Sequence, residues 1–188
     1  KTMDEALNLL TEAVKKAGYS KKVKFGLDCA ASEFYDEKNR VYNLEGKKLN
    51  SDKLAEKYFN LVKEYPLITI EDPFAEDDLQ AFKLFMKDKD SHPSRSVRKL
   101  QVVGDDLLVT NIQRINLAHI YRACNALLLK VNQIGTVTEA IEASLLANTY
   151  GWKTMVSHRS GETEDTFIAD LAVGLSTGQI KSGAPCRG

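Results

Sequence analysis

Six short apolar runs alternate along this chain with segments in which apolar residues recur at helical spacing. The runs occupy residues 23–28, 67–71, 101–105, 126–130, 153–158 and 179–181. The helical spacing predicts helices over about residues 2–17, 51–64, 78–86, 111–122, 136–150 and 164–175. Short apolar strands that alternate with helices are typical of a parallel α/β fold.

Every apolar run ends in a charged or titratable residue. In chain order these residues are Asp28, Glu71, Asp105, Lys130, His158 and Lys181. Because the carboxyl ends of barrel strands surround a single site, the pattern predicts an α/β barrel of the TIM type with its polar strand ends directed at that site. The 188 residues are fewer than the about 250 that a complete (β/α)8 barrel typically has, so we expect an incomplete barrel.

Two segments fall outside the strand–helix alternation. Apolar and aromatic pairs on either side of residues 36–39 predict a small hairpin, and Ser51 is predicted to cap the helix that follows it. Residues 87–99 are almost wholly polar and contain Pro93. We therefore predict that 87–99 is an inserted surface loop.

Composition narrows the classes of protein to which the chain can belong. The 26 basic and 26 acidic side chains balance, which argues against a nucleic-acid partner, and no apolar run approaches the length of a membrane span. The scattered Cys29, Cys124 and Cys186 predict reduced thiols in a cytoplasmic protein, with Cys29 as a packing residue. Since a helical pattern starts at once and the last residues are loop-like, we expect a fragment of a longer protein.

The first three strand ends are acidic. Carboxylates gathered at one edge would repel one another, and a hard divalent cation such as Mg²⁺ would relieve that repulsion. The alternative is that Asp28, Glu71 and Asp105 each cap the helix that follows, which would explain any one of them taken alone. Their matched positions on successive strands favour the metal site.

The later strand ends carry amines and an imidazole. Lys130 is either a surface lysine with an apolar stem or a buried amine that serves as a general base. Arg159 and Ser160, directly after His158, suit a phosphate or carboxylate, and Lys181 occupies another position for an anion or a proton. A metal together with a lysine base indicates proton abstraction next to a carboxylate, through an enediolate.

Several motifs in the chain resemble those of the enolase family. They lie at residues 71–74 (EDPF), 104–107 (GDDL), 127–136 (LLLKVNQIGT), 157–165 (SHRSGETED) and 178–185 (GQIKSGAP). The resemblance implies the C-terminal catalytic barrel of a phosphopyruvate hydratase. Such an enzyme depends on Mg²⁺ and dehydrates 2-phosphoglycerate to phosphoenolpyruvate, and the family suggests a cytoplasmic homodimer.

The resemblance also implies a role for each strand-end residue. Asp28, Glu71 and Asp105 would hold Mg²⁺, and Lys130 would be the catalytic base, as in the enolase superfamily generally. His158 would act in catalysis and contact the substrate. Arg159 and Ser160 would bind the phosphate, and Lys181 the carboxylate.

Parts of the family pattern are missing from this sequence. The N-terminal domain with its mobile loop and general-acid glutamate, the first barrel strands and the last helix have no counterpart, so we expect the chain alone to be inactive. One alternative is an enolase-like chain that serves as a structural subunit of a larger assembly. Another is a related reaction on a different carboxylate, against which the Arg159-Ser160 phosphate position argues.

Overall fold

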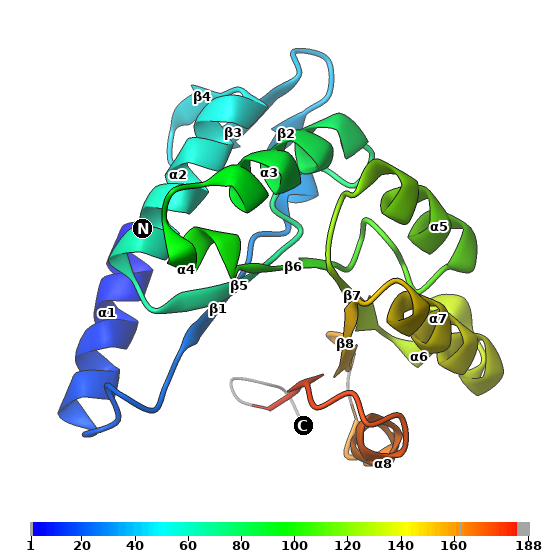
Figure 1. Cartoon of the computed structure of the whole chain (residues 1–188). Helices are drawn as coiled ribbons and strands as arrows, with labels where there is room; N and C mark the ends of the chain where they lie inside the picture. Colours follow the sequence, from blue (N-terminus) through cyan, green and yellow to red (C-terminus); the bar gives the residue numbers. More distant parts are fainter. Residues whose placement is uncertain (1, 162, 184–188) are drawn as a thin grey trace. The chain divides into compact units, whose positions relative to one another are not determined.

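The computed structural model describes residues 2–161 and 163–183 (Figure 1). The chain forms two compact units, the first ending at Gln101 and the second starting at Val102. Strands and helices alternate in each unit, so the predicted α/β class is confirmed. Among the described residues, no helix has the length and apolar character needed to cross a membrane.

The first unit combines a pair of parallel strands with a small antiparallel sheet and helices. Its elements are α1 (Met3–Lys16), β1 (Phe25–Asp28), the 3-10 helix η1 (Ala31–Phe34), β2 (Tyr35–Asp36), β3 (Val41–Leu44), β4 (Lys47–Leu49), α2 (Ser51–Glu64), β5 (Leu67–Glu71), α3 (Leu79–Ser91) and α4 (Arg95–Arg98). β1 pairs in parallel with β5, whereas β2, β3 and β4 pair antiparallel. The predicted hairpin therefore exists, with a third strand added to it.

Aromatic side chains fill the core of the first unit. Tyr42, Tyr58, Phe74, Phe82 and Phe85 are all fully buried. Phe74 meets both Phe82 and Phe85 edge to face, with ring centroids 5.5 Å apart in each pair. Edge-to-face packing is a favoured geometry for aromatic pairs, and it joins the segment after β5 to the inner face of α3.

The cap of α2 differs by one residue from the prediction. Asn50, not Ser51, is the N-cap, because its side-chain oxygen accepts a hydrogen bond from the Lys53 N–H at 3.0 Å. The Ser51 hydroxyl instead lies 3.3 Å from Asp78 Oδ2. Asn and Ser are similarly good N-caps, so the local sequence could not separate these neighbours.

Residues 87–99 are largely exposed, as predicted, but the prediction that they form a loop is wrong. α3 continues to Ser91, α4 covers Arg95–Arg98, and Val97 is fully buried. Lys89 is only 3% exposed, and its ammonium donates to Asp90 Oδ1 at 2.7 Å and to the Arg98 carbonyl at 3.1 Å. The polar composition concealed this packing because a lysine buries an apolar stem while its charge finds polar partners.

The second unit is built on parallel strands. Its elements are β6 (Gln101–Gly104), α5 (Ile112–Tyr121), β7 (Ala126–Leu129), α6 (Val131–Ile134), α7 (Val137–Thr149), β8 (Lys153–Ser157), α8 (Phe167–Gly174) and β9 (Ile180–Lys181). β7 pairs in parallel with β6 and with β8, and β8 pairs in parallel with β9. All four residues of β7 are buried. Because these strands run parallel, the carboxyl ends of β7, β8 and β9 lie at the same edge of the sheet.

Candidate active site at the strand ends

Two acids lie side by side at the strand ends of the first unit. Asp28 and Glu71 are register partners at the last positions of β1 and β5. The pairing extends beyond the strands, because the Cys29 N–H donates to the Glu71 carbonyl at 2.9 Å and the Ala31 N–H to the Asp72 carbonyl at 3.2 Å. Glu71 and Asp72 are 5% and 3% exposed. Two of the three acids predicted to meet, Asp28 and Glu71, therefore lie at neighbouring strand ends.

The backbone turns sharply after both of these strands. Ala30 has φ 42° and Asp72 has φ 40°, left-handed values that are uncommon for residues other than glycine. Such conformations cost about 1–3 kcal/mol and persist only where the surroundings impose them. The hydrogen bonds between the two chain segments supply that constraint and hold the acids next to each other.

In the second unit, a carboxylate and an amine meet between neighbouring strand ends. Asp105 follows β6 and Lys130 follows β7, and Lys130 Nζ lies 2.5 Å from Asp105 Oδ2. Their side chains are 14% exposed for Lys130 and 11% for Asp105. A charge-assisted hydrogen bond withdrawn from water is strong and sets both groups in place. The reading of Lys130 as a surface lysine therefore does not hold.

A third side chain, Gln133, contacts the Asp105–Lys130 pair, and it was not among the predicted site residues. Its Nε2 donates to Asp105 Oδ1 at 2.9 Å, so both carboxylate oxygens accept from a side-chain donor. Gln133 lies in α6, a one-turn helix that directly follows Lys130. The available signal was its place three residues after Lys130, since residues at that spacing lie on the same side of a helical turn.

The remaining candidate residues follow β8 and β9. His158 and Arg159 line a cavity of about 810 Å³ that is also lined by Val131 and Asn132, the residues directly after Lys130. His158 Nδ1 lies 2.7 Å from the Arg159 carbonyl oxygen. The cavity therefore brings together residues that follow β7 and β8.

Ser160 and Lys181 are placed less closely around this cavity. Ser160 is exposed in the segment after β8, and it is not among the described residues that line the cavity. Lys181 is half-buried and is the register partner of Ser157, the last residue of β8. In the motif that contains Lys181, Ala184 and Pro185 lie outside the described residues.

The described cysteines are packing residues. Cys29 and Cys124 are free thiols, and both are buried. Burial, together with the nearby Asp28 carboxylate, raises the pKa of the Cys29 thiol far above its usual range. The predictions of reduced thiols and of a packing role for Cys29 are confirmed for these two, while Cys186 lies outside the described residues.

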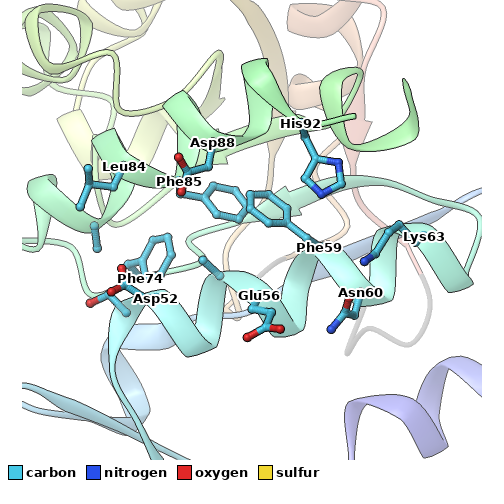
Figure 2. Close-up of a pocket in the computed structure, with 13 residues that line it drawn as sticks. Asp52, Glu56, Phe59, Asn60, Lys63, Phe74, Leu84, Phe85, Asp88 and His92 are labelled. Atoms are coloured by element: carbon cyan, nitrogen blue, oxygen red, sulfur yellow. The ribbon is translucent and has the colours of Figure 1, made fainter. Parts of the chain in front are cut away.

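A second cavity lies on the helices, away from the strand ends. It has a volume of about 360 Å³ and lies between α2 and α3 (Figure 2). Asp52, Glu56 and Asp88 lie around it, and Phe59 stacks on Phe85 at its floor, with ring centroids 4.7 Å apart. None of the described residues that line this cavity is a predicted site residue.

The two other histidines of the described chain pack against aromatic rings. The ring of His92 lies 5.3 Å from that of Phe59, centroid to centroid. His119 stacks on Tyr150 with the centroids 3.6 Å apart. These contacts indicate that both histidines are packing residues.

Parallel strands followed by helices, with acids and a lysine at the carboxyl ends, define this chain as an α/β domain of the kind that carries its chemistry at its strand ends. Residues 1–188 match the family model described as "Enolase, C-terminal TIM barrel domain". The chain therefore belongs to the enolase family, and the predicted barrel class is confirmed.

A curated relative leads to the same family. All 188 residues align at 55% identity with a protein from Methanocaldococcus jannaschii named "Enolase". The chain spans 42% of that relative's length. Both matches run through residues 87–99, the segment that was predicted to be an insertion.

Proposed function

We propose that the full-length protein is a phosphopyruvate hydratase that dehydrates 2-phosphoglycerate to phosphoenolpyruvate. The observation that carries this proposal is the Lys130–Asp105 pair at neighbouring strand ends, in a chain 55% identical to a named enolase. We further propose that the protein is a cytoplasmic homodimer. Because the chain spans 42% of that relative, we assign the activity to the full-length protein and expect this chain alone to be inactive.

The proposed general base is Lys130. Its amine takes the proton from carbon 2 of the substrate, and the electron pair of the broken C–H bond moves toward the substrate carboxylate. The ammonium that forms on Lys130 is stabilised by Asp105, whose carboxylate lies within hydrogen-bonding distance. Loss of hydroxide from carbon 3 then requires an acid, which we place outside this chain.

We propose Mg²⁺ as the cofactor, with Asp28, Glu71 and Asp105 as its protein ligands. The donor set fits a hard cation, since all three side chains offer carboxylate oxygens and Asp28 and Glu71 are neighbours across paired strands. When bound, the ion stabilises the negative charge that develops on the substrate carboxylate.

The residues after β8 and β9 are proposed to position the substrate. Arg159 and Ser160 bind the phosphate, Lys181 binds the carboxylate, and His158 contacts the substrate and takes part in catalysis. Two cationic groups and a hydroxyl suit a substrate that carries both a phosphate and a carboxylate. Support comes from the cavity that His158 and Arg159 line beside α6.

The proposal is tested with the full-length protein and 2-phosphoglycerate. We expect formation of the enol product, followed by its ultraviolet absorbance, to stop when a chelator removes divalent cations and to resume when Mg²⁺ is restored. Turnover that persists in excess chelator would overturn the metal assignment. Turnover of a non-phosphorylated hydroxy acid in place of 2-phosphoglycerate would overturn the substrate assignment.

A further inference from the structure

We infer that Gln133 and Thr110 are positioning residues that hold Asp105 and Lys130 in the arrangement the reaction needs. The inference rests on the proposed function, because it assigns these two residues a part in the same site. Neither residue ends a strand, and neither was among the predicted site residues. Hydrogen bonds connect them to both members of the Asp105–Lys130 pair.

The carboxylate of Asp105 determines the orientation of the Gln133 amide. Gln133 Nε2 lies 2.9 Å from Asp105 Oδ1, and Gln133 Oε1 lies 2.9 Å from Thr110 Oγ1. The reversed amide would place its oxygen against a carboxylate oxygen, and two acceptors at that distance repel each other. The amide therefore donates to Asp105 and accepts from Thr110.

The Thr110 hydroxyl joins the amide to the backbone of the proposed base. Thr110 is fully buried, and its Oγ1 accepts the Lys130 N–H at 3.0 Å. The single hydroxyl hydrogen is directed to Gln133 Oε1, since the other acceptor, the Leu128 carbonyl, is farther away at 3.5 Å. One hydroxyl thus ties the main chain of Lys130 to the side chain that holds Asp105.

The backbone is strained at Thr110, which carries this hydroxyl, and at the residue before it. Val109 and Thr110 are consecutive β-branched residues with φ 42° and 56°, a conformation that is a genuine outlier for such side chains. The Val109 N–H donates to the Asp105 carbonyl at 2.7 Å, and the Asn111 N–H donates to the Leu108 carbonyl at 2.8 Å. Strain of this kind gathers at functional sites, where the surroundings maintain it.

The short helix α6 positions the side-chain amide of Gln133. The Gln133 N–H donates to the Lys130 carbonyl at 3.0 Å, so one helical turn separates the two residues. Their side chains reach opposite oxygens of the same Asp105 carboxylate. Gly135 then ends the turn at φ 108°, a value that glycine adopts without strain. The motif around Lys130 therefore supplies a base and a carboxylate-holding amide from one turn.

Substitutions at both positions test the inference in the full-length protein. Gln133→Leu removes both hydrogen bonds of the amide, whereas Thr110→Val removes only the hydroxyl and Thr110→Ser keeps it. Groups that orient metal ligands typically contribute about 10- to 100-fold to activity or metal affinity, and we expect losses in kcat of that size for Gln133→Leu and Thr110→Val. KM should change by less than about threefold, and Thr110→Ser should restore kcat.

The matched control is Thr154→Val. Thr154 is another buried threonine of the second unit, and its hydroxyl lies 3.3 Å from Ser144 Oγ. We expect this variant to keep wild-type kcat. A general effect of losing a buried hydroxyl would lower kcat in Thr154→Val as much as in Thr110→Val, and that result would overturn the inference.

A second readout separates failure of the inference from failure of the proposed function. Binding of Mn²⁺, measured by electron paramagnetic resonance without substrate, should weaken about 10-fold or more in Gln133→Leu, because its Asp105 carboxylate loses a fixed orientation. If the wild-type protein does not turn over 2-phosphoglycerate, the proposed function fails and this measurement still tests the inference. Wild-type Mn²⁺ affinity together with wild-type kcat in Gln133→Leu would overturn the inference alone.

Discussion

Two lysines of this chain are largely withdrawn from water, and only one of them belongs to the candidate site. The side chain of Lys89 is 4% exposed and that of Lys130 is 14% exposed. Both pair with a carboxylate, Lys89 with Asp90 at 2.7 Å and Lys130 with Asp105 at 2.5 Å. Burial and ion pairing alone therefore do not distinguish the proposed general base, Lys130, from a lysine of the α3–α4 connection.

The partners make the difference between the two lysines. Asp90 is 68% exposed, and the second acceptor of Lys89 is the Arg98 carbonyl, so this ammonium closes the connection between α3 and α4. Asp105 is 11% exposed and receives a second donor from Gln133. Lys130 thus pairs with a largely buried carboxylate that Gln133 also holds, whereas Lys89 pairs with an exposed one.

The largest expected effect separates the two lysines by activity. In the full-length protein, Lys130→Met should lower kcat by about 10²- to 10⁴-fold, because a positioned general base contributes that much. Lys89→Met is the matched control and should leave kcat unchanged, since Lys89 lies in the α3–α4 connection. Initial rates of enol formation measure both. Equal losses in the two variants would show that Lys130 has no special part in the reaction.

The next effect concerns Cys29, which follows a strand end without being reactive. Its pKa is raised by burial above an ordinary value of 9.0, so the folded state keeps a proton that the unfolded state releases. The buried thiol therefore makes its full contribution to the free energy of unfolding below the ordinary pKa. As pH rises above the ordinary pKa, that contribution falls by up to about 1.4 kcal/mol per pH unit. Denaturant unfolding at about pH 8 and about pH 10 should show a steeper loss in wild type than in Cys29→Ala. Identical slopes would contradict the buried-thiol account.

A smaller effect separates the lysines by stability. Lys89→Met keeps the apolar stem and removes the ammonium, which leaves the Arg98 carbonyl without this donor and should lower the free energy of unfolding by about 1–2 kcal/mol. Lys87→Met is the control, because Lys87 is an exposed residue of the same helix. Denaturant midpoints and slopes measure both. If Lys87→Met destabilises as much as Lys89→Met, the Lys89 contacts are not what stabilises the α3–α4 connection.

The smallest expected effect tests whether a left-handed backbone conformation outside the candidate site also contributes to activity. Arg122 ends α5 with φ 53° and is exposed, away from the Asp105–Lys130 pair. Glycine adopts this conformation without penalty, and Arg122→Gly should raise the free energy of unfolding by about 0.5–1 kcal/mol with activity unchanged. Thermal unfolding measures the shift. A loss of activity would show that the strained positions outside the site also matter for the reaction.

The strand ends were the part of the site that sequence could predict. Each apolar run became a parallel strand, and the adjacent placement of Asp28 and Glu71 follows from that pattern. The position of Lys130 beside the Asp105 strand follows in the same way. Helices were recovered where an N-cap residue and an apolar face coincided, as at Asn111 for α5 and Thr136 for α7.

The remaining features depend on contacts between residues far apart in the chain. The Thr110–Gln133 bond spans 23 positions and the Gln133–Asp105 bond spans 28, so no local pattern encodes them. The helices within 87–99 were not predicted for a related reason. Lys89 is a polar residue in the sequence, but it is buried in the fold.

The sequence by itself determined the alternation of strands and helices, the acids and lysines at the strand ends, and the family they indicate, because residue periodicity and strand direction are local properties. Only the tertiary structure decided which of those charges are paired, which lysine is structural, and which strained residues hold the Asp105–Lys130 pair. Those outcomes depend on burial and on hydrogen-bond partners, and both exist only after distant segments have packed together.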